Sequence, residues 1–318
     1  MPVEKIRVLL VGLGQVGMKY DLKSEHSQVL THLKAIRNWV ANSQHELKLF
    51  GIDSDVLTEE TFKNIAPEGI WLNTYETLKS EQPFNLAVIA TPIHSIAANV
   101  LDLCKKLEIQ KVVIEKPAAK SLAELATLNY LNDSENKFIV GFPRPSLQSS
   151  NYIRESIKIF GESEAWKVDI YYGGGVLNIL SHFLNLVEFF FSTFDLESHS
   201  LDNEGNLHAE FKSKDGSLNI STHKYSDRND ENNRIEIQGP LRISYLNSGR
   251  EIRIYKFDSQ GKEVFELIDA REEISQMIGV FGNDYMNWAV YSKGFNYTNI
   301  SSNALYQTIK LSEVSNGQ

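Results

Sequence analysis

The chain has 318 residues, of which 42% are hydrophobic and 23% are charged. This is the composition of an average globular protein, and it excludes collagen-like, disordered and coiled-coil classes. Because a chain of this length exceeds what one compact core usually holds, we expect two domains.

The formal net charge of −9 argues against a protein that neutralises nucleic-acid phosphates. No apolar run approaches the ~20 residues that a bilayer-spanning helix needs, so neither nucleic acid nor a membrane is an expected partner. The single cysteine, Cys104, cannot form an internal disulfide, which fits a reducing cytoplasm. No metal site is predicted.

The first part of the chain alternates Val/Ile/Leu-rich runs with segments of helical periodicity, which is typical of a parallel sheet with crossover helices. The near-continuous apolar runs predict strands that are covered on both faces. The expected strands are residues 6–11, 47–52, 86–90, 112–115 and 138–141, with a weaker one at 70–73. The expected helices are residues 32–40, 95–107 and 122–131.

Pro143 and Pro145 interrupt regular structure, and the sequence after them alternates with a period of two. We therefore place a domain boundary here, between a first domain at residues 1–142 and a second at residues 143–318. The expected strands of the second domain are residues 166–172, 207–211, 218–223, 234–237, 241–246, 251–255 and 264–267.

Tight turns at Asp215-Gly216 and Ser248-Gly249 join several of these strands, so the second sheet is expected to be mostly antiparallel. Helices at residues 272–291 and 303–314 are expected to cover one face of it. The other face is left open for a second copy of the chain. The predicted fold class is therefore α/β, with a doubly wound parallel sheet followed by a large open sheet.

A glycine pattern, Gly12-Leu13-Gly14-Gln15-Val16-Gly17, directly follows the first expected strand. In such a pattern the first glycine permits a tight turn, the second admits a pyrophosphate, and the third lets the next helix pack on the strand. The N-terminus of that helix favours the phosphates. We interpret Gly12, Gly14, Gln15, Val16 and Gly17 as cofactor-binding residues; the alternative is a glycine turn without a ligand.

Asp53 ends the second expected strand, where a carboxylate would hold a ribose 2′-hydroxyl. It stands 36 residues after Gly17, because 53 − 17 = 36, whereas the usual gap is about 20. A polar insertion at residues 21–28 accounts for the excess. Asp53 and the nearby Asp55 would repel a 2′-phosphate, so NAD is favoured over NADP. The alternative is a solvent-exposed aspartate.

Two further strand ends lead to the same edge of the sheet, where open α/β sheets bind ligands. The first carries Thr91-Pro92 and His94, and the second carries Glu115-Lys116-Pro117. A cation directly after a buried strand needs water, a partner or a substrate. Pro117 excludes helical geometry at Lys116, which is therefore expected in an extended or cis arrangement. An ordinary surface lysine is the alternative.

In the second domain, three glycines at 173–175 precede an apolar segment of helical pattern at 176–187. Asn178, Ser181, His182 and Asn185 recur there at three- and four-residue spacing, which predicts one shared helix face. Amide and imidazole groups in place of lysine and glutamate indicate a polar pocket, in which the Asn178 amide could orient the His182 ring. The alternative is a buried histidine that its neighbours satisfy.

Together these motifs resemble the Gfo/Idh/MocA family of NAD(P)-dependent oxidoreductases, the family of glucose-fructose oxidoreductase and inositol dehydrogenase. The likeness runs through most of the chain, and the Glu-Lys-Pro triplet is its most specific element. The resemblance implies an N-terminal Rossmann domain and a C-terminal domain whose open sheet mediates dimers or tetramers. It also implies a nicotinamide cofactor and a small sugar, polyol or sugar-nucleotide substrate.

By the same resemblance, Lys116 would hydrogen-bond the reacting oxygen and His182 would exchange its proton while hydride passes between nicotinamide and a secondary alcohol or ketone. Arg144 and Asn185 would be substrate contacts. The chain departs from the family at Asn178, where members commonly carry an aspartate, because an amide cannot stabilise imidazolium by charge. A nicotinamide-binding regulator or sensor that has lost the chemistry is therefore the alternative, and a glycosidase or lyase that uses NAD transiently is a third.

Overall fold

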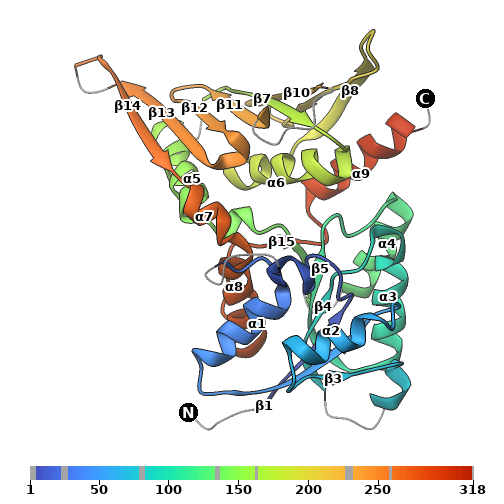
Figure 1. The fold of residues 1–318 in the computed structure, drawn as a ribbon. Coiled ribbons are helices and arrows are strands. Elements are labelled where there is room, and N and C mark those ends of the chain that lie inside the picture. Colours follow the sequence, from blue (N-terminus) through green and yellow to red (C-terminus); the bar gives the residue numbers. More distant parts are fainter. Residues whose placement is uncertain are drawn as a thin grey trace. The chain divides into compact units, whose positions relative to one another are not determined.

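A computed structural model describes residues 5–22, 28–78, 83–132, 137–161, 164–225, 232–257 and 260–316. The chain divides into two compact units, each built around one sheet (Figure 1). Unit 1 comprises Met1–Ser146 and Ser275–Ile300, and unit 2 comprises Leu147–Ile274 and Ser301–Gln318. The chain first passes from unit 1 to unit 2 after Ser146, close to the predicted boundary at residues 142/143. Unlike the prediction, the chain then returns to unit 1 near its C-terminus.

The sheet of unit 1 has seven strands in the order β15-β6-β5-β4-β1-β2-β3. β1 pairs in parallel with both β2 and β4, so the strand order reverses between β1 and β4, as in a doubly wound sheet. β15 is antiparallel to β6. The strands are β1 (Lys5–Val11), β2 (Glu46–Ile52), β3 (Ile70–Trp71), β4 (Phe84–Ile89), β5 (Ile109–Glu115), β6 (Phe138–Gly141) and β15 (Thr298–Asn299).

The central strands of this sheet are buried on both faces, as their apolar runs predict. Val8, Leu9 and Leu10 on β1 are fully buried, and so are Val112, Val113 and Ile114 on β5. In Figure 1, α3 and α4 lie on one side of the sheet and α1 and α8 on the other. The helices of unit 1 are α1 (His32–Ala41), α2 (Thr58–Ile65), α3 (Ile93–Lys106), α4 (Leu122–Asn132) and α8 (Met277–Tyr291), with short 3-10 turns η1 (Lys19–Leu22), η2 (Tyr75–Leu78) and η3 (Arg144–Ser146).

The predicted helix at 272–291 was expected on the second sheet, and this expectation is wrong. The segment divides into α7 (Arg271–Ser275) and α8, and α8 buries Phe281 and Tyr285 in the core of unit 1. A Cβ at Gly282 would lie 2.4 Å from the Cβ of Ala35 on α1, so the close contact between the two helices requires glycine. Helical periodicity indicates that a face is buried but not which sheet buries it.

The sheet of unit 2 has eight strands in the order β14-β13-β12-β11-β7-β10-β9-β8. β7 and β10 are parallel, while the other pairs are antiparallel, so the prediction of a mostly antiparallel sheet is confirmed. The strands are β7 (Trp166–Gly173), β8 (Asp195–Leu201), β9 (Leu207–Lys212), β10 (Leu218–Tyr225), β11 (Arg234–Gln238), β12 (Arg242–Leu246), β13 (Glu251–Phe257) and β14 (Glu263–Asp269).

Helices α5 (Gln148–Gly161), α6 (Ser181–Phe190) and α9 (Asn303–Asn316) lie along one face of this sheet (Figure 1). Helix α9 was predicted from the sequence, whereas α5 and β8 were not. Tyr152 of α5 donates a hydrogen bond of 2.8 Å to Glu266 of β14, which marks the helix-covered face of that strand. Within the described ranges, every helix is too short or too polar to span a bilayer.

Candidate functional site

A crevice of about 490 Å³ lies where the strand order of unit 1 reverses. It is formed by the segments that follow the carboxyl ends of β1, β2 and β4, which is where open α/β sheets bind ligands. Its lining includes Val11, Gly12, Gly14, Lys19, Ile52, Asp53, Ser54, Asp55, Thr58, Asn73, Tyr75, Ala90, Thr91, Pro92, Ser95 and Asn99.

The three glycines of the turn meet different surroundings. Gly12 has a φ of +88°, and a Cβ there would lie 2.6 Å from the carbonyl oxygen of Ala90. A Cβ at Gly17 would lie 2.2 Å from the carbonyl oxygen of Gly12. At Gly14, by contrast, no described atom lies within 4 Å of the Cβ position. The turn itself therefore requires Gly12 and Gly17, whereas Gly14 borders open space in the crevice.

The helix expected directly after the glycine turn is split. The Met18 N–H donates to the Gly14 carbonyl at 2.9 Å, and the short turn η1 follows. Helix α1 begins only at His32, whose N–H donates to the carbonyl of Val16 at 3.0 Å. The predicted polar insertion separates the two pieces, and its residues 23–27 lie outside the described ranges. The N-terminus of α1 is thus tied to the glycine turn without continuing from it.

Asp53 lines the crevice and also braces the glycine turn. Its Oδ2 accepts a hydrogen bond of 2.6 Å from the N–H of Leu13, and its Oδ1 accepts one of 2.9 Å from the N–H of Asp55. Asp53 was predicted to hold a ribose or to be solvent-exposed, and its contact with the turn was not predicted. A carboxylate oxygen accepts more than one hydrogen bond, so bracing the turn and binding a hydroxyl are compatible.

Other predicted crevice residues divide into two groups. Thr91 and Pro92 line the crevice, and the Thr91 hydroxyl accepts a hydrogen bond of 3.2 Å from Asn99 Nδ2. His94 is exposed in the first turn of α3, outside the described lining. Lys19 was missed by sequence reasoning, although its position two residues after the last glycine of the turn was a usable signal. It adds a cation to a crevice that Asp53 and Asp55 otherwise make acidic.

Lys116 follows β5, the neighbour of β4, and is half-buried. The Lys116–Pro117 peptide is cis, one of the two arrangements that the sequence predicted. Burial lowers the pKa of Lys116, the Glu115 carboxylate raises it in opposition, and the Arg144 guanidinium lowers it further. Arg144, in η3, is itself buried at 8% exposure. Unit 1 therefore brings together two predicted site residues, Lys116 and Arg144, that are 28 positions apart in the sequence, because 144 − 116 = 28.

His182 lies in unit 2, in the first turn of α6, and is half-buried. Asn178 precedes it in a π-helical turn, η4 (Val176–Leu180), and is exposed. The predicted pair therefore spans the junction between this turn and the regular helix α6.

The predicted polar stripe runs across the junction between η4 and α6, and its four residues differ in exposure. Ser181 is buried, and its hydroxyl donates a hydrogen bond of 2.8 Å to the carbonyl of Leu177. Asn185 is also buried, at 4% exposure, whereas Asn178 is exposed. His182 and Asn185 remain close in the sequence of α6, but the four polar residues do not form one accessible row.

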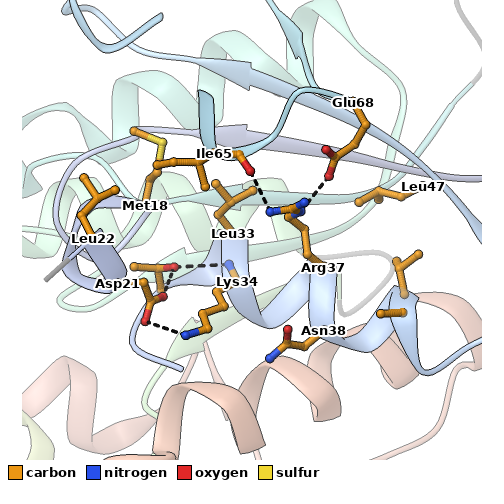
Figure 2. A pocket seen from close by; sticks show the side chains of 13 residues that line it. Met18, Asp21, Leu22, Leu33, Lys34, Arg37, Asn38, Leu47, Ile65 and Glu68 are labelled. Atoms are coloured by element: carbon orange, nitrogen blue, oxygen red, sulfur yellow. Dashed lines mark hydrogen bonds and ion pairs between the residues drawn. The ribbon is translucent and has the colours of Figure 1, made fainter. Parts of the chain in front are cut away.

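Unit 1 has a second hollow, of about 650 Å³, bordered by η1, α1, β2 and α2. Figure 2 shows the Lys34 side chain directed toward Asp21, and the Arg37 side chain directed toward Glu68 and the carbonyl of Ile65. Lys34 Nζ is 3.8 Å from Asp21, while Arg37 donates at 2.8 Å to Ile65 and lies 2.7 Å from Glu68. Because each cation is paired with an acid of the same unit, this hollow offers a ligand no charge preference.

Among solved structures, the chain is similar to a levoglucosan dehydrogenase in complex with NADH and levoglucosan. The TM-score is 0.77 at 12% identity, covering 98% of this chain and 96% of that one. It is also similar to the UDP-N-acetylglucosamine 3-dehydrogenase GnnA from Acidithiobacillus ferrooxidans, with a TM-score of 0.69, 12% identity, and coverage of 98% and 96%. The transcriptional regulator Gal80p from Kluyveromyces lactis has a TM-score of 0.73 at 14% identity, with coverage of 99% and 91%.

The chain therefore has the fold of the Gfo/Idh/MocA dehydrogenases, and the predicted resemblance is confirmed at the level of the fold. No family model matches the sequence, and neither does any curated protein. Dehydrogenases and a transcriptional regulator share this fold. The choice between enzyme and regulator consequently depends on the residues of the site.

Proposed function

We propose that the chain is an oxidoreductase that binds NAD(H), in preference to NADP(H), and transfers hydride between the nicotinamide and a small substrate. The substrate class is a sugar, polyol or sugar nucleotide that reacts at a secondary alcohol or ketone. The observation that carries this proposal is Lys116, a half-buried cation that directly follows β5, the strand next to β4. A lowered lysine pKa is typical of functional sites.

The crevice residues fit a dinucleotide. The open space beside Gly14 leaves room for a pyrophosphate, whose charge the backbone N–H groups of the turn can meet. Asp53 is proposed to hold a ribose. The negative charges of Asp53 and Asp55 support NAD over NADP, because they would repel a 2′-phosphate. When bound, the cofactor supplies or accepts the hydride.

The chain's own groups are proposed to handle the oxygen and its proton. The Lys116 ammonium group stabilises the charge that develops on the reacting oxygen, and its lowered pKa makes it a better proton donor than an ordinary lysine. His182 is proposed to exchange the proton of that oxygen. Arg144 and Asn185 are proposed substrate contacts, and the charge that Arg144 exerts on Lys116 supports its inclusion.

The test of this proposal separates cofactor binding from chemistry. Binding of NADH and of NADPH is measured by fluorescence, followed by an absorbance screen of polyols, sugar acids and sugar nucleotides in both directions. We expect NADH to bind more tightly than NADPH and at least one carbohydrate derivative to turn over. Absence of binding by both cofactors would contradict the proposal.

A second candidate is a nicotinamide-binding regulator with the same fold. Asn178 supports it, because an exposed amide stands where family members commonly carry an acid, and the likeness to Gal80p shows that regulators use this fold. Cofactor binding without turnover of any carbohydrate derivative would favour the regulator, whereas steady NADH consumption would exclude it.

We also propose that the open face of the unit 2 sheet binds a second copy of the chain. Phe265 and Leu267 alternate along β14 with Glu266, which faces α5, so both lie on the opposite face, at 55% and 56% exposure. Arg234 stacks at 3.9 Å over Tyr171 on the same sheet. Light scattering should report a dimer or tetramer that Phe265→Lys dissociates; a monomeric parent protein would contradict the proposal.

The proposed location is the cytoplasm. Cys104 is half-buried, and burial raises the pKa of its thiol, which keeps it protonated and slow to react. Recovery of the protein outside the cytosolic fraction of its cells would contradict this location.

A further inference from the structure

A buried histidine in unit 1 contacts two titratable side chains that the proposed mechanism does not use. His32 is fully buried at the start of α1. Its Nε2 lies 2.9 Å from Oε1 of Glu115, and its Nδ1 lies 3.2 Å from the hydroxyl of Tyr285 on α8. Because a carboxylate only accepts hydrogen bonds, the Nε2 of His32 carries the hydrogen that faces Glu115, whether or not the ring is charged.

The backbone of the same residue is attached to the glycine turn. The His32 N–H donates to the carbonyl of Val16 at 3.0 Å, and the next N–H, of Leu33, donates to that of Gly17 at 3.1 Å. His32 therefore connects two parts of the candidate site: the turn that borders the crevice and the residue directly before Lys116. Both connections lie within unit 1.

The Glu115 carboxylate is confined on another side as well. Glu115 on β5 is paired with Gly141 on β6, where a Cβ would lie 2.7 Å from Oε1 of Glu115. The side chain of Glu115 is only 13% exposed. A buried carboxylate is costly without a donor, and His32 supplies one through a short contact.

We propose that His32 is a positioning residue, which holds the Glu115 carboxylate beside Lys116 and thereby keeps the lysine ammonium group ready to bind the reacting oxygen. This inference rests on the proposed function, because that function gives Lys116 its task. The charged and titratable groups around the pair are Arg144 from η3, which faces Lys116, and Tyr285 from α8, which faces His32.

The electrostatics of the site agree with this role. The Glu115 carboxylate raises the pKa of Lys116, against burial and Arg144, which both lower it. Burial, and next the charge of Glu115, raise the pKa of Tyr285, so its phenol stays protonated. A displaced Glu115 carboxylate would counter burial less, and the pKa of Lys116 would fall further.

The experiment is a double-mutant cycle in which the measured quantity is the titration of Lys116, in the absence of substrate. The protein is labelled with trace acetic anhydride across a range of pH. Mass spectrometry of the peptide that carries Lys116 then gives the titration curve of this lysine. We expect Glu115→Gln and His32→Leu each to move the titration to lower pH. The double variant should add little to Glu115→Gln, because His32 acts through that carboxylate. Glu124→Gln, in the exposed pair with Lys120, is the matched control that should leave Lys116 unchanged.

An unchanged Lys116 titration in folded His32→Leu, or additive shifts in the double variant, would overturn the proposal. His32→Gln keeps an N–H donor and should restore the parent titration, which separates positioning from simple destabilisation. Tyr285→Phe keeps the ring in the core and tests the Nδ1 contact alone. In the turnover assay, His32→Leu should lower kcat by about tenfold to a hundredfold, the loss of one hydrogen bond to a charged group, with little change in NADH affinity.

The two proposals can fail separately. If no carbohydrate derivative turns over but the labelling cycle behaves as expected, the positioning role holds and the proposed function is wrong. If turnover is found but His32→Leu leaves Lys116 unmoved, the proposed function holds and the positioning role is wrong.

Discussion

Lys116 and His182 each follow a buried strand, but the two strand ends are built differently. Lys116 stands in a short turn whose neighbours are confined: Glu115 is held by His32 at 2.9 Å and packs against Gly141. His182 is reached through a glycine at φ +96°, Gly174, and then through the π-helical turn η4. Lys116 therefore directly continues a buried strand, whereas an irregular turn separates His182 from the end of β7.

This difference shows which sequence signals can be trusted. The Glu-Lys-Pro triplet and the glycine turn are steric patterns, in which each residue type is required by a particular contact or dihedral angle. The polar stripe of Asn178 to Asn185 is a periodic pattern, which assumes a regular helix. The π-helical turn η4 carries Asn178, whereas Ser181, His182 and Asn185 lie in the regular helix α6, so the assumption of one regular helix does not hold at Asn178.

The largest expected effect is on Lys116. Lys116→Ala should lower kcat by about a hundredfold to a thousandfold, the loss of one preorganised donor to a developing oxyanion. NADH-linked turnover is the measurement, and NADH binding by fluorescence should stay near the parent value. Lys120→Ala is the matched control, because this lysine is exposed and pairs with Glu124. Retained turnover in Lys116→Ala would remove the residue from the mechanism.

A somewhat smaller effect on turnover is expected at His182, which an irregular turn separates from its strand. His182→Gln should lower kcat by about a hundredfold, at the low end of what a positioned acid or base contributes. The readout is turnover across a range of pH, with Phe189→Leu on the same helix as the control. If His182→Gln keeps full activity, proton exchange belongs to another group and the comparison of the two strand ends loses its functional meaning.

Two glycines of the turn are expected to affect different quantities: Gly17 the free energy of unfolding, and Gly14 the affinity for NADH. Gly17→Ala should lower the free energy of unfolding by about 1–3 kcal/mol, because the new Cβ would meet the Gly12 carbonyl. Gly14→Ala should change it by less than about 0.5 kcal/mol while weakening NADH binding at least about tenfold, or 1.4 kcal/mol. Urea unfolding and fluorescence titration measure the two quantities. Equal NADH affinity in Gly14→Ala would show that the open space beside this glycine is not used.

The smallest effect concerns two buried tyrosines, one in each unit. Burial, and next the charge of Asp102, raise the pKa of Tyr75 to about 12; burial alone also raises that of Tyr172. Since the folded chain holds these protons more tightly than the unfolded chain, their contribution to stability is complete below about pH 10 and is lost as the pH rises beyond it.

Alkaline unfolding curves of Tyr75→Phe and Tyr172→Phe measure this contribution. Each variant should lose stability less steeply above the ordinary tyrosine pKa than the parent, and Tyr130→Phe, at an exposed residue, should behave like the parent. If stability falls as steeply with pH in Tyr75→Phe as in the parent, burial in the crevice does not raise the pKa of Tyr75.

Much of the fold follows from local patterns in the sequence. The apolar runs predict the parallel strands because a strand buried on both faces needs apolar side chains at every position. Alternation predicts seven of the eight strands of the second sheet, since one face of each is buried and the other is not. β8 escapes detection because, apart from two half-buried residues, its burial pattern is exposed.

The candidate site was predictable in part. Gly12, Gly14, Asp53 and Thr91 line one crevice, as their positions at strand ends imply. Lys19 was missed because its position two residues after the last glycine was the one signal, and its residue type alone does not distinguish it from a surface lysine. The partnership of His32 with Glu115 and Tyr285 was also out of reach, since these residues are separated by 83 and 253 positions.

The sequence by itself indicated the strands of the two sheets, the glycine turn and the cation at the end of β5, because each follows from a local pattern of residue types. Only the tertiary structure decided that α8 belongs to the first sheet, that a π-helical turn precedes His182, and that a histidine at the start of α1 holds the acid beside Lys116. The physical reason is that these depend on which buried surfaces meet, and local spacing does not encode the partner of a buried face.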